Sequence, residues 1–381
     1  MLLTKKLKTG IYFAMYLLYM IAFYIFYASN FQSLFDNAET IYRFSYYIIV
    51  LAMCILFIFS KMQMKNWVLS IFFVFVGFVS YRNANDNVIL LTIFMIIGAQ
   101  NIDFERFIKL DFFLRIFIFL LVSVSEKIGI IGSTVLYRSD GFVRDGFGFL
   151  QPNTAGALLL SIFLEYFVIR YKKINVFDYA LGVGIMMFTL ETTNSRSSVL
   201  GMFLGLILML AFKGKTNFLL RSRVVGFFIK LLFPILALLS YFAVRFYNPM
   251  SRLWNILDQL FSGRLNLISY FVKNYPVKLL GQYIQLQDPM NLRNTYFLVM
   301  DNGYISMLLK YGVVILFVFC YFYISYSRNL LNAANFAYLI PVIIMSFVGL
   351  MENTLYSPAY NFTLILLISI AGIKSVESSN E

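Results

Sequence analysis

Apolar residues in this chain fall into long runs that are separated by short polar stretches. About twelve such runs can be drawn, at roughly 15–22 residues for each membrane span. They lie near residues 11–27, 44–60, 67–81, 87–99, 107–124, 152–170, 177–191, 197–212, 225–246, 303–325, 334–351 and 358–373. The pattern predicts an all-α polytopic membrane protein, a single domain over residues 1–381 with about twelve transmembrane helices. The runs do not form two matching halves, which argues against a transporter built from internal repeats.

The composition excludes a soluble protein. Of the 381 residues, 61% are hydrophobic and only 13% are charged, which is roughly half the charged share of soluble globular proteins. Histidine is absent, so neither histidine-based acid–base catalysis nor the commonest metal ligand is available. Any base must therefore be a carboxylate, a tyrosine, a lysine or the substrate itself.

The net charge of +13 indicates how the helices are oriented, rather than binding to nucleic acid. Lysines concentrate in short loops on one side of the predicted bundle, including Lys5, Lys6, Lys61, Lys65, Lys172, Lys173 and Lys213. This side is predicted to be the cytoplasm, and both termini lie on it. The opposite side carries mostly arginine, namely Arg43, Arg82, Arg138, Arg144, Arg196, Arg245, Arg252, Arg264 and Arg293. Arginine forms paired hydrogen bonds to phosphate and carboxylate, so an anionic partner outside is indicated, the alternative being that arginine merely tolerates interfacial packing.

Two of the predicted external segments are long, at about residues 125–151 and 247–302. The second contains an amphipathic pattern, with Leu253, Trp254, Ile256, Leu257, Leu260 and Phe261 at helical spacing. A break at Ser262-Gly263 and a second short helix that ends before Pro276 are expected. Such helices either lie in the membrane interface or form a cap over the bundle, and the two descriptions are compatible.

Four fragments on this external side carry a resemblance to a known family. They are "VRDGFGFLQPNTAG" at 143–156, "TTNSRSSVLG" at 192–201, "SGRLNLISYFVKNYPVKLLGQ" at 262–282 and "MDNGYISMLLKYGVVILFVF" at 300–319. Together they resemble the bacterial O-antigen and capsular polysaccharide polymerases of the Wzy type, and more distantly the O-antigen ligases. In that superfamily a Pro-Asn pair and a Ser-Arg pair open helices, and an arginine lies in a long external loop. A His-Asn or Asp-Asn pair then starts the next helix, and this chain has aspartate there.

The resemblance implies inverting, metal-independent glycosyl transfer on the outer face of the bacterial cytoplasmic membrane, on a GT-C-like fold. No metal and no cofactor are expected, in agreement with this chemistry. Donor and acceptor would be glycans on undecaprenyl pyrophosphate, with a flippase and a chain-length regulator as further partners. The alternatives are a ligase that moves finished glycan to another acceptor, and a flippase for lipid-linked oligosaccharide. A flippase should line its interior with charge and have short external loops, whereas this chain concentrates arginine in long external segments.

If the resemblance holds, arginines are the candidates for stabilising the diphosphate leaving group. Arg196 and Arg264 are predicted to be catalytic, and Arg138 and Arg144 to bind substrate. Arg196 opens a helix whose amide groups also favour phosphate, although "TNSRSS" is equally a helix cap. The alternatives for Arg264 and Arg144 are a solvated kink residue and a partner of Asp145, respectively. Pro152 and Asn153 start a helix, and Asn153 is counted among the substrate-binding residues.

Asp301 is the candidate base for the acceptor hydroxyl. The alternatives are that Asp301 is a helix cap, or that an activated diphosphate donor reacts without a base. Asn302 and Tyr304 are expected to position sugar hydroxyls. Further external carboxylates serve as second-line bases or arginine partners: Asp140, Asp145, Glu191, Asp258 and Glu352.

Charged residues inside apolar runs are expected to face a cavity or a partner. Arg115 and Glu165 are predicted to pair, because this would join the two helices that flank the first external loop. For Lys310, the sequence leaves open a contact with the phosphate of the lipid carrier or a side chain that simply extends to the interface.

Overall fold

The computed structural model describes residues 4–60, 64–137, 141–213, 222–286 and 299–367. Its helices are α1 (Lys5–Phe26), α2 (Ala38–Ile58), α3 (Met64–Ala84), α4 (Val88–Gly98), α5 (Phe104–Lys127), α6 (Pro152–Arg170), α7 (Val176–Thr192), α8 (Arg196–Lys213), α10 (Arg223–Lys230), α11 (Leu232–Arg245), α12 (Arg252–Leu260), α13 (Arg264–Asn274), α14 (Gly303–Ser306), α15 (Val313–Asn332), α16 (Phe336–Val348) and α17 (Thr363–Leu366). Two short strands, β1 (Val135–Tyr137) and β2 (Val143–Asp145), pair antiparallel. Single turns of 3-10 helix cover Asn30–Leu34, Ala99–Asn101, Tyr171–Lys173 and Asn353–Tyr356, and a π-helical turn covers Met307–Tyr311.

Among the described residues, six helices are long and apolar enough to cross a membrane: α1, α2, α3, α6, α8 and α15. The pair α10 and α11 makes a seventh if it is one span, since the two are bent by 60° at a short break. The chain is therefore a multi-pass membrane protein with an all-α body. Exposed aromatic side chains such as Phe44, Phe75 and Phe117 provide the surface that lipid would contact.

The expected count of about twelve crossing helices is only partly met. Helices do form in the other apolar runs, but α4 has 11 residues and α16 has 13, which is short of the roughly 20 residues that a bilayer requires. Helix α5 is long enough, but Asp111 and Arg115 interrupt its apolar character. In the described part of the last run, α-helix is limited to the four residues of α17.

The run expected near 303–325 is broken rather than continuous. Its first part is α14 and the π-helical turn, and Gly312 then adopts φ +94° before α15 begins. A side chain at Gly312 would meet the backbone of Gly281 at 2.3 Å and that of Leu279 at 2.4 Å. The part of the long second loop around Leu279 and Gly281 thus lies directly against this break, which only glycine permits.

Helix α6 lies at the centre of the bundle. In the most apolar 18-residue stretch of α6, 72% is buried inside the protein, compared with 28% in the corresponding stretch of α2. Pro152 occupies the first turn of α6 and fits there because its missing N–H has no intrahelical partner at that position. Asn153 lies at the start of α6, and Glu165 lies among its buried residues.

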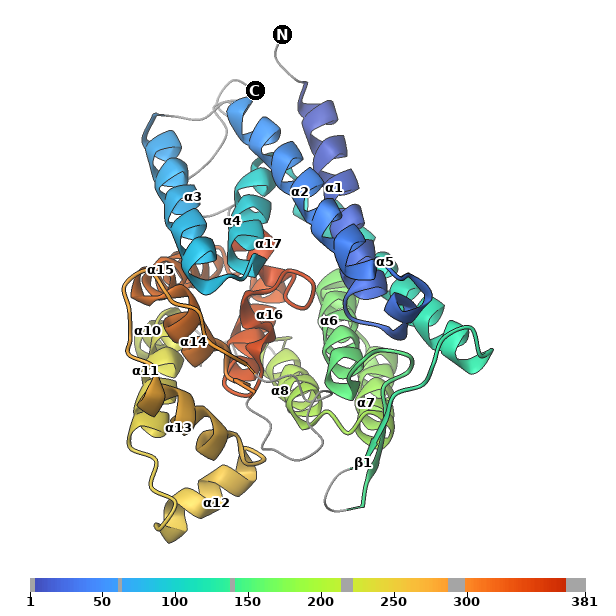
Figure 1. Ribbon diagram of the computed structural model, residues 1–381, viewed down its shortest axis with the longest axis vertical. Coiled ribbons are helices and arrows are strands. Elements are labelled where there is room, and N and C mark those ends of the chain that lie inside the picture. Colours follow the sequence, from blue (N-terminus) through green and yellow to red (C-terminus); the bar gives the residue numbers. More distant parts are fainter. Residues whose placement is uncertain (1–3, 61–63, 138–140, 214–221, 287–298, 368–381) are drawn as a thin grey trace.

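The two ends of the bundle differ in character (Figure 1). One end holds the β-hairpin, α12 and α13, which Figure 1 shows at the bottom. The break between α12 and α13 falls at Ser262 and Gly263, both with positive φ, as the sequence predicts. At the other end, the start of α5, the end of α6 and the start of α16 surround a cavity of about 490 Å³ whose lining includes Lys109 and Lys172.

Candidate active site

Glu352 joins three separate parts of the chain at the end that carries α12 and α13. Its carboxylate oxygen Oε1 accepts hydrogen bonds from Arg264 Nη2 at 2.9 Å, from Ser197 Oγ at 2.6 Å and from Asn153 Nδ2 at 3.4 Å. Glu352 follows α16, and its side chain is only 8% exposed. The carboxylate therefore fixes α6, α8 and α13 relative to one another.

Arg264 contacts two carboxylates at once. Besides Glu352, its Nε lies 3.5 Å from Oδ2 of Asp301. Arg264 is the first residue of α13, and the left-handed backbone of Gly263 (φ +79°) turns the chain so that α13 can begin there. The side chains of Arg264 and Asp301 are 15% and 28% exposed, so this charge group is open to solvent or to a ligand.

Arg144 extends this polar network on the side of the hairpin. Its Nη2 donates to Asn153 Oδ1 at 2.5 Å and its Nε donates to the carbonyl of Thr193 at 2.9 Å. Asn153 therefore bridges Arg144 to Glu352 through its own amide. Asp145, the suggested partner of Arg144, instead has Lys127 at 3.6 Å.

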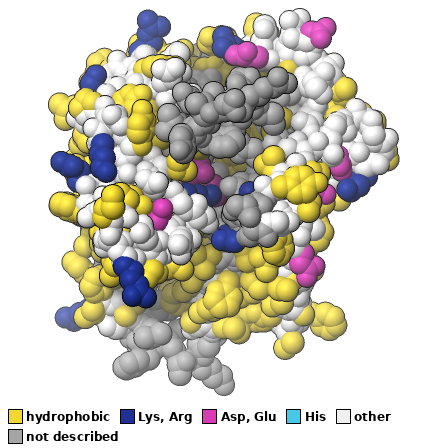
Figure 2. Space-filling view, turned by 60° about the horizontal axis from the view of Figure 1, so that its bottom comes forward, with side chains coloured by type: hydrophobic (Ala, Val, Ile, Leu, Met, Phe, Trp, Pro, Cys, Tyr) yellow, Lys and Arg dark blue, Asp and Glu magenta, His cyan; other side chains and the backbone are white. Residues whose placement is uncertain are grey.

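The four sequence fragments that carry the family resemblance meet in this network. Arg144 and Asn153 come from the first fragment, Ser197 from the second, and Arg264 and Asp301 from the third and fourth, as the contacts above establish. We call the residues Arg144, Asn153, Ser197, Arg264, Asp301 and Glu352 the Glu352 cluster. Figure 2 turns this end of the bundle toward the viewer and shows acidic and basic side chains together near the middle of the face.

The pKa of Asp301 is raised by its surroundings in the cluster. Burial and, second, the negative charge of Glu352 raise its pKa to about 7, and the guanidinium of Arg264 acts in the opposite direction. A carboxylate with this pKa is ionised in a large fraction of molecules near neutral pH, and it binds a proton more strongly than an ordinary aspartate. That is the property required of a general base.

Arg196 lies beside the cluster, although no described contact links its side chain to Glu352. It is the first residue of α8, as the sequence predicts, and it directly precedes Ser197. Its side chain is exposed at the surface. Arg138, the other arginine predicted to bind substrate, lies outside the described residues.

Asn302 and Tyr304 have structural tasks that differ from the predicted contacts with sugar. Asn302 caps α14, because its Oδ1 accepts from the amides of Tyr304 and Ile305. Its Nδ2 donates to Ser240 Oγ and to the carbonyl of Leu350. Tyr304 is 1% exposed, and its hydroxyl donates to the carbonyl of Ser346 at 2.7 Å. These contacts lie within the bundle, and the expectation that both residues contact substrate stays a prediction. The cap suggested for Asp301 is provided by its neighbour Asn302.

Glu352 was considered from the sequence only as a second-line carboxylate. The signal was present in the stretch "MENTLYSP" (351–358), where a single acidic residue follows an apolar run. The partners of Glu352 lie 88, 155 and 199 residues away in the chain, and no local pattern identifies such contacts. Lys310 is likewise explained by a distant residue, since its ammonium pairs with the carboxylate of Asp86.

Comparisons with protein-family models, with curated proteins and with solved structures give no match.

Proposed function

We propose that this chain is a membrane glycosyltransferase that polymerises lipid-diphosphate-linked oligosaccharide units, as its resemblance to the Wzy-type polymerases implies. The observation that carries the proposal is the Glu352 cluster, in which residues from all four resembling fragments lie within hydrogen-bonding or ion-pair distance. Fragments that match a family by chance have no reason to meet at one end of a bundle.

The chemistry assigned to the cluster begins at Asp301. An acceptor hydroxyl gives its proton to the Asp301 carboxylate while its oxygen forms a bond to the anomeric carbon of the donor. The bond from that carbon to the diphosphate oxygen breaks, its electron pair remains on the diphosphate, and the configuration at the carbon inverts. The pKa of Asp301, about 7 because of burial and the nearby Glu352, suits this transfer.

Arginine stabilises the charge that develops on the leaving group. Arg264 is partly exposed, and its ion pair with Glu352 fixes its orientation, so it is the main candidate for a contact with diphosphate. The exposed Arg196 at the start of α8 is the second. One positioned donor of this kind contributes roughly 10²–10³ in rate. Asn153 and Ser197 hold Glu352, and Arg144 supports Asn153.

The proposal includes a location and a topology. The cluster faces the outside of a bacterial cytoplasmic membrane, and about twelve crossing or re-entrant segments place both termini in the cytoplasm. The substrates are lipid-linked glycan donor and acceptor, and a flippase and a chain-length regulator are expected partners. No metal or cofactor is assigned a role in this reaction.

The test uses full-length protein in cells that lack their own copy. Arg264→Ala and Arg196→Ala should each give surface glycans of one repeat unit, while lipid-linked units still reach the outside. Arg252→Ala is the matched control, because Arg252 is an exposed arginine on the neighbouring α12, and it should give full-length polymer. Full-length polymer in both test variants contradicts the assignment of these arginines.

The same cells distinguish the alternative functions. In a ligase, loss of the protein leaves polymer of normal length on its lipid carrier. In a flippase, loss of the protein leaves single lipid-linked units on the cytoplasmic side. Either result replaces the polymerase proposal.

A further inference from the structure

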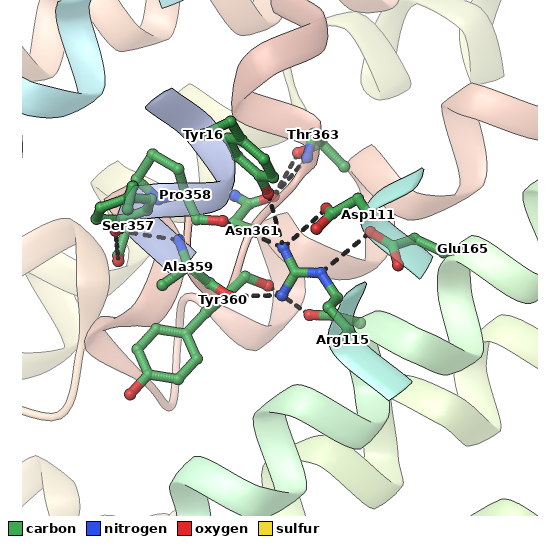
Figure 3. Close-up of polar contacts among 12 residues, drawn as sticks. Tyr16, Asp111, Arg115, Glu165, Ser357, Pro358, Ala359, Tyr360, Asn361 and Thr363 are labelled. Carbon is green, nitrogen blue, oxygen red and sulfur yellow. Dashed lines mark hydrogen bonds and ion pairs between the residues drawn. The ribbon is translucent and has the colours of Figure 1, made fainter. Parts of the chain in front are cut away.

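A second group of charges lies inside the bundle, away from the Glu352 cluster. Arg115 of α5 contacts Asp111 on the same helix at 3.0 Å and Glu165 of α6 at 3.2 Å, which confirms the predicted pairing of Arg115 with Glu165. All three side chains are 0% exposed. Figure 3 shows both carboxyl groups directed toward the guanidinium from their two helices. We call these three residues the Arg115 cluster.

The guanidinium has further partners that carry no charge. Its Nη1 donates to the carbonyl of Ala359 at 2.5 Å, and its Nη2 donates to the carbonyl of Pro358 at 3.2 Å and to the Tyr16 hydroxyl at 3.4 Å (Figure 3). None of these groups supplies a second positive charge. Two buried carboxyl groups therefore share a single cation.

In the part of the chain that the structure describes, the charged and titratable groups that face the cluster come from three helices. They are Tyr12, Tyr16, Tyr19 and Tyr24 of α1, Asp111 and Arg115 of α5, and Glu165 of α6. The tyrosines are neutral, so they do not balance the charge. If both carboxyl groups were ionised, one negative charge would remain uncompensated within the bundle, where charge is very unfavourable.

The hydrogen bonds of the two carboxyl groups are also incomplete. Oδ1 of Asp111 and Oε2 of Glu165 are buried, and neither has a hydrogen-bond partner among the described residues. A buried acceptor without a donor destabilises the fold by about 1–3 kcal/mol, and by more when it is charged. Adding one proton to either group removes the excess charge and converts an acceptor into a donor.

We propose that the Arg115 cluster is a proton-binding site, in which Asp111 and Glu165 together hold one proton beside the guanidinium of Arg115. The bound proton makes the cluster electrically neutral within the bundle. The proposal concerns a site that the glycosyl transfer does not use, so it stands or falls independently of the proposed function.

The site also has a place in the wider structure. Arg115 holds the carbonyls of Pro358 and Ala359, and this segment begins shortly after Glu352. The hydroxyl of Tyr24 donates to the carbonyl of Ala359, and the amide of Ala359 donates to the hydroxyl of Tyr19. The proton-binding cluster thus anchors the residues between the 3-10 turn Asn353–Tyr356, which follows Glu352, and α17.

Infrared spectroscopy of the purified full-length protein in lipid nanodiscs tests the proposal. A protonated carboxyl group has a C=O stretching band that an ionised carboxylate lacks. The spectrum is recorded in buffer alkaline enough to ionise Asp301, whose pKa is about 7. The wild type should retain the band. Asp111→Asn and Glu165→Gln should each lose it, because the remaining carboxylate then pairs with Arg115 in its ionised form.

The control is Glu191→Gln, which removes an exposed carboxylate at the end of α7 and should leave the band unchanged. A wild-type spectrum without the band overturns the proposal, and this measurement does not depend on any variant folding. Persistence of the band at full intensity in both Asp111→Asn and Glu165→Gln also overturns it, since the proton would then lie elsewhere.

Discussion

The Arg115 cluster and the Glu352 cluster each contain a guanidinium that lies between an aspartate and a glutamate, Arg115 in the first and Arg264 in the second. In the Arg115 cluster the ion pairs measure 3.0 and 3.2 Å and no side chain is exposed. In the Glu352 cluster they measure 3.5 and 2.9 Å, and Asp301 is 28% exposed. These two groups of one arginine and two carboxylates therefore differ in access to solvent far more than in composition.

That difference separates a structural role from a reactive one. Charges sealed among helices can change partners only if the fold opens, so they hold elements together. Charges at a partly open end can exchange one partner for a ligand while the fold remains intact. The comparison predicts that the same substitution will destabilise the protein in one cluster and inactivate it in the other.

The largest effect is expected from Arg115→Leu. This change leaves Asp111 and Glu165 without a cation and releases the carbonyls of Pro358 and Ala359. Removing one partner of a buried ion pair costs about 3–5 kcal/mol, so the unfolding temperature and the yield of folded protein should fall strongly. Arg264→Leu is the matched comparison, and thermal unfolding in detergent should show a much smaller change for it. Equal losses in the two variants would remove the distinction between the clusters.

The next effect concerns activity. Asp301→Asn removes the assigned base from the open cluster but preserves its size, so polymer formation should fall roughly 10²–10⁴-fold with little change in unfolding temperature. Asp111→Asn, the same substitution in the sealed cluster, should keep most of the activity because the Arg115–Glu165 pair remains. Glycan chain length and initial rate in membranes measure both. Normal turnover by Asp301→Asn would exclude Asp301 as a base.

A third prediction uses the pKa of Asp301. Since the negative charge of Glu352 is one of the causes that raise this pKa to about 7, Glu352→Gln should lower it. A base works in its ionised form, so the activity that rises with pH through about 7 in the wild type should rise at lower pH in the variant. The pH profile of the initial rate measures the shift. Glu191→Gln, an exposed carboxylate outside the cluster, should leave the profile in place.

The sequence alone predicted those parts of the structure that depend on neighbouring residues. The apolar runs, the start of α6 at Pro152 and the break between α12 and α13 at Gly263 follow from local patterns. The π-helical turn after α14 does not follow from a local pattern, and its residues Lys310 and Tyr311 lie directly against Gly281 of the preceding loop. The β-hairpin was missed because its strands have only three residues each.

The candidate site shows the same division. Arg264 and Asp301 could be chosen because charge is rare in this chain and each lies near the start of a helix. For Tyr304, the sequence does not reveal that its hydroxyl reaches the carbonyl of Ser346 inside the bundle. Glu352 was underrated because its importance comes entirely from residues on α6, α8 and α13.

The smallest effect is expected from Asn153→Ala, which removes the link between Arg144 and Glu352. Glu352 keeps Arg264 and Ser197 as partners, so the cluster should remain assembled and activity should fall roughly tenfold, as for the loss of about 1.4 kcal/mol. Arg144→Ala should cause a loss of similar size, and the double variant should lose little more than either one, because both changes break the same link. Fully additive losses, measured as initial rates of polymer formation in membranes, would mean that Arg144 acts through a separate contact with the diphosphate. The Glu352 cluster would then contain a second reactive arginine. If Arg144 only supports Asn153, Arg264 is the one arginine of the Glu352 cluster that acts on the substrate, and it occupies the position that Arg115 has in the Arg115 cluster.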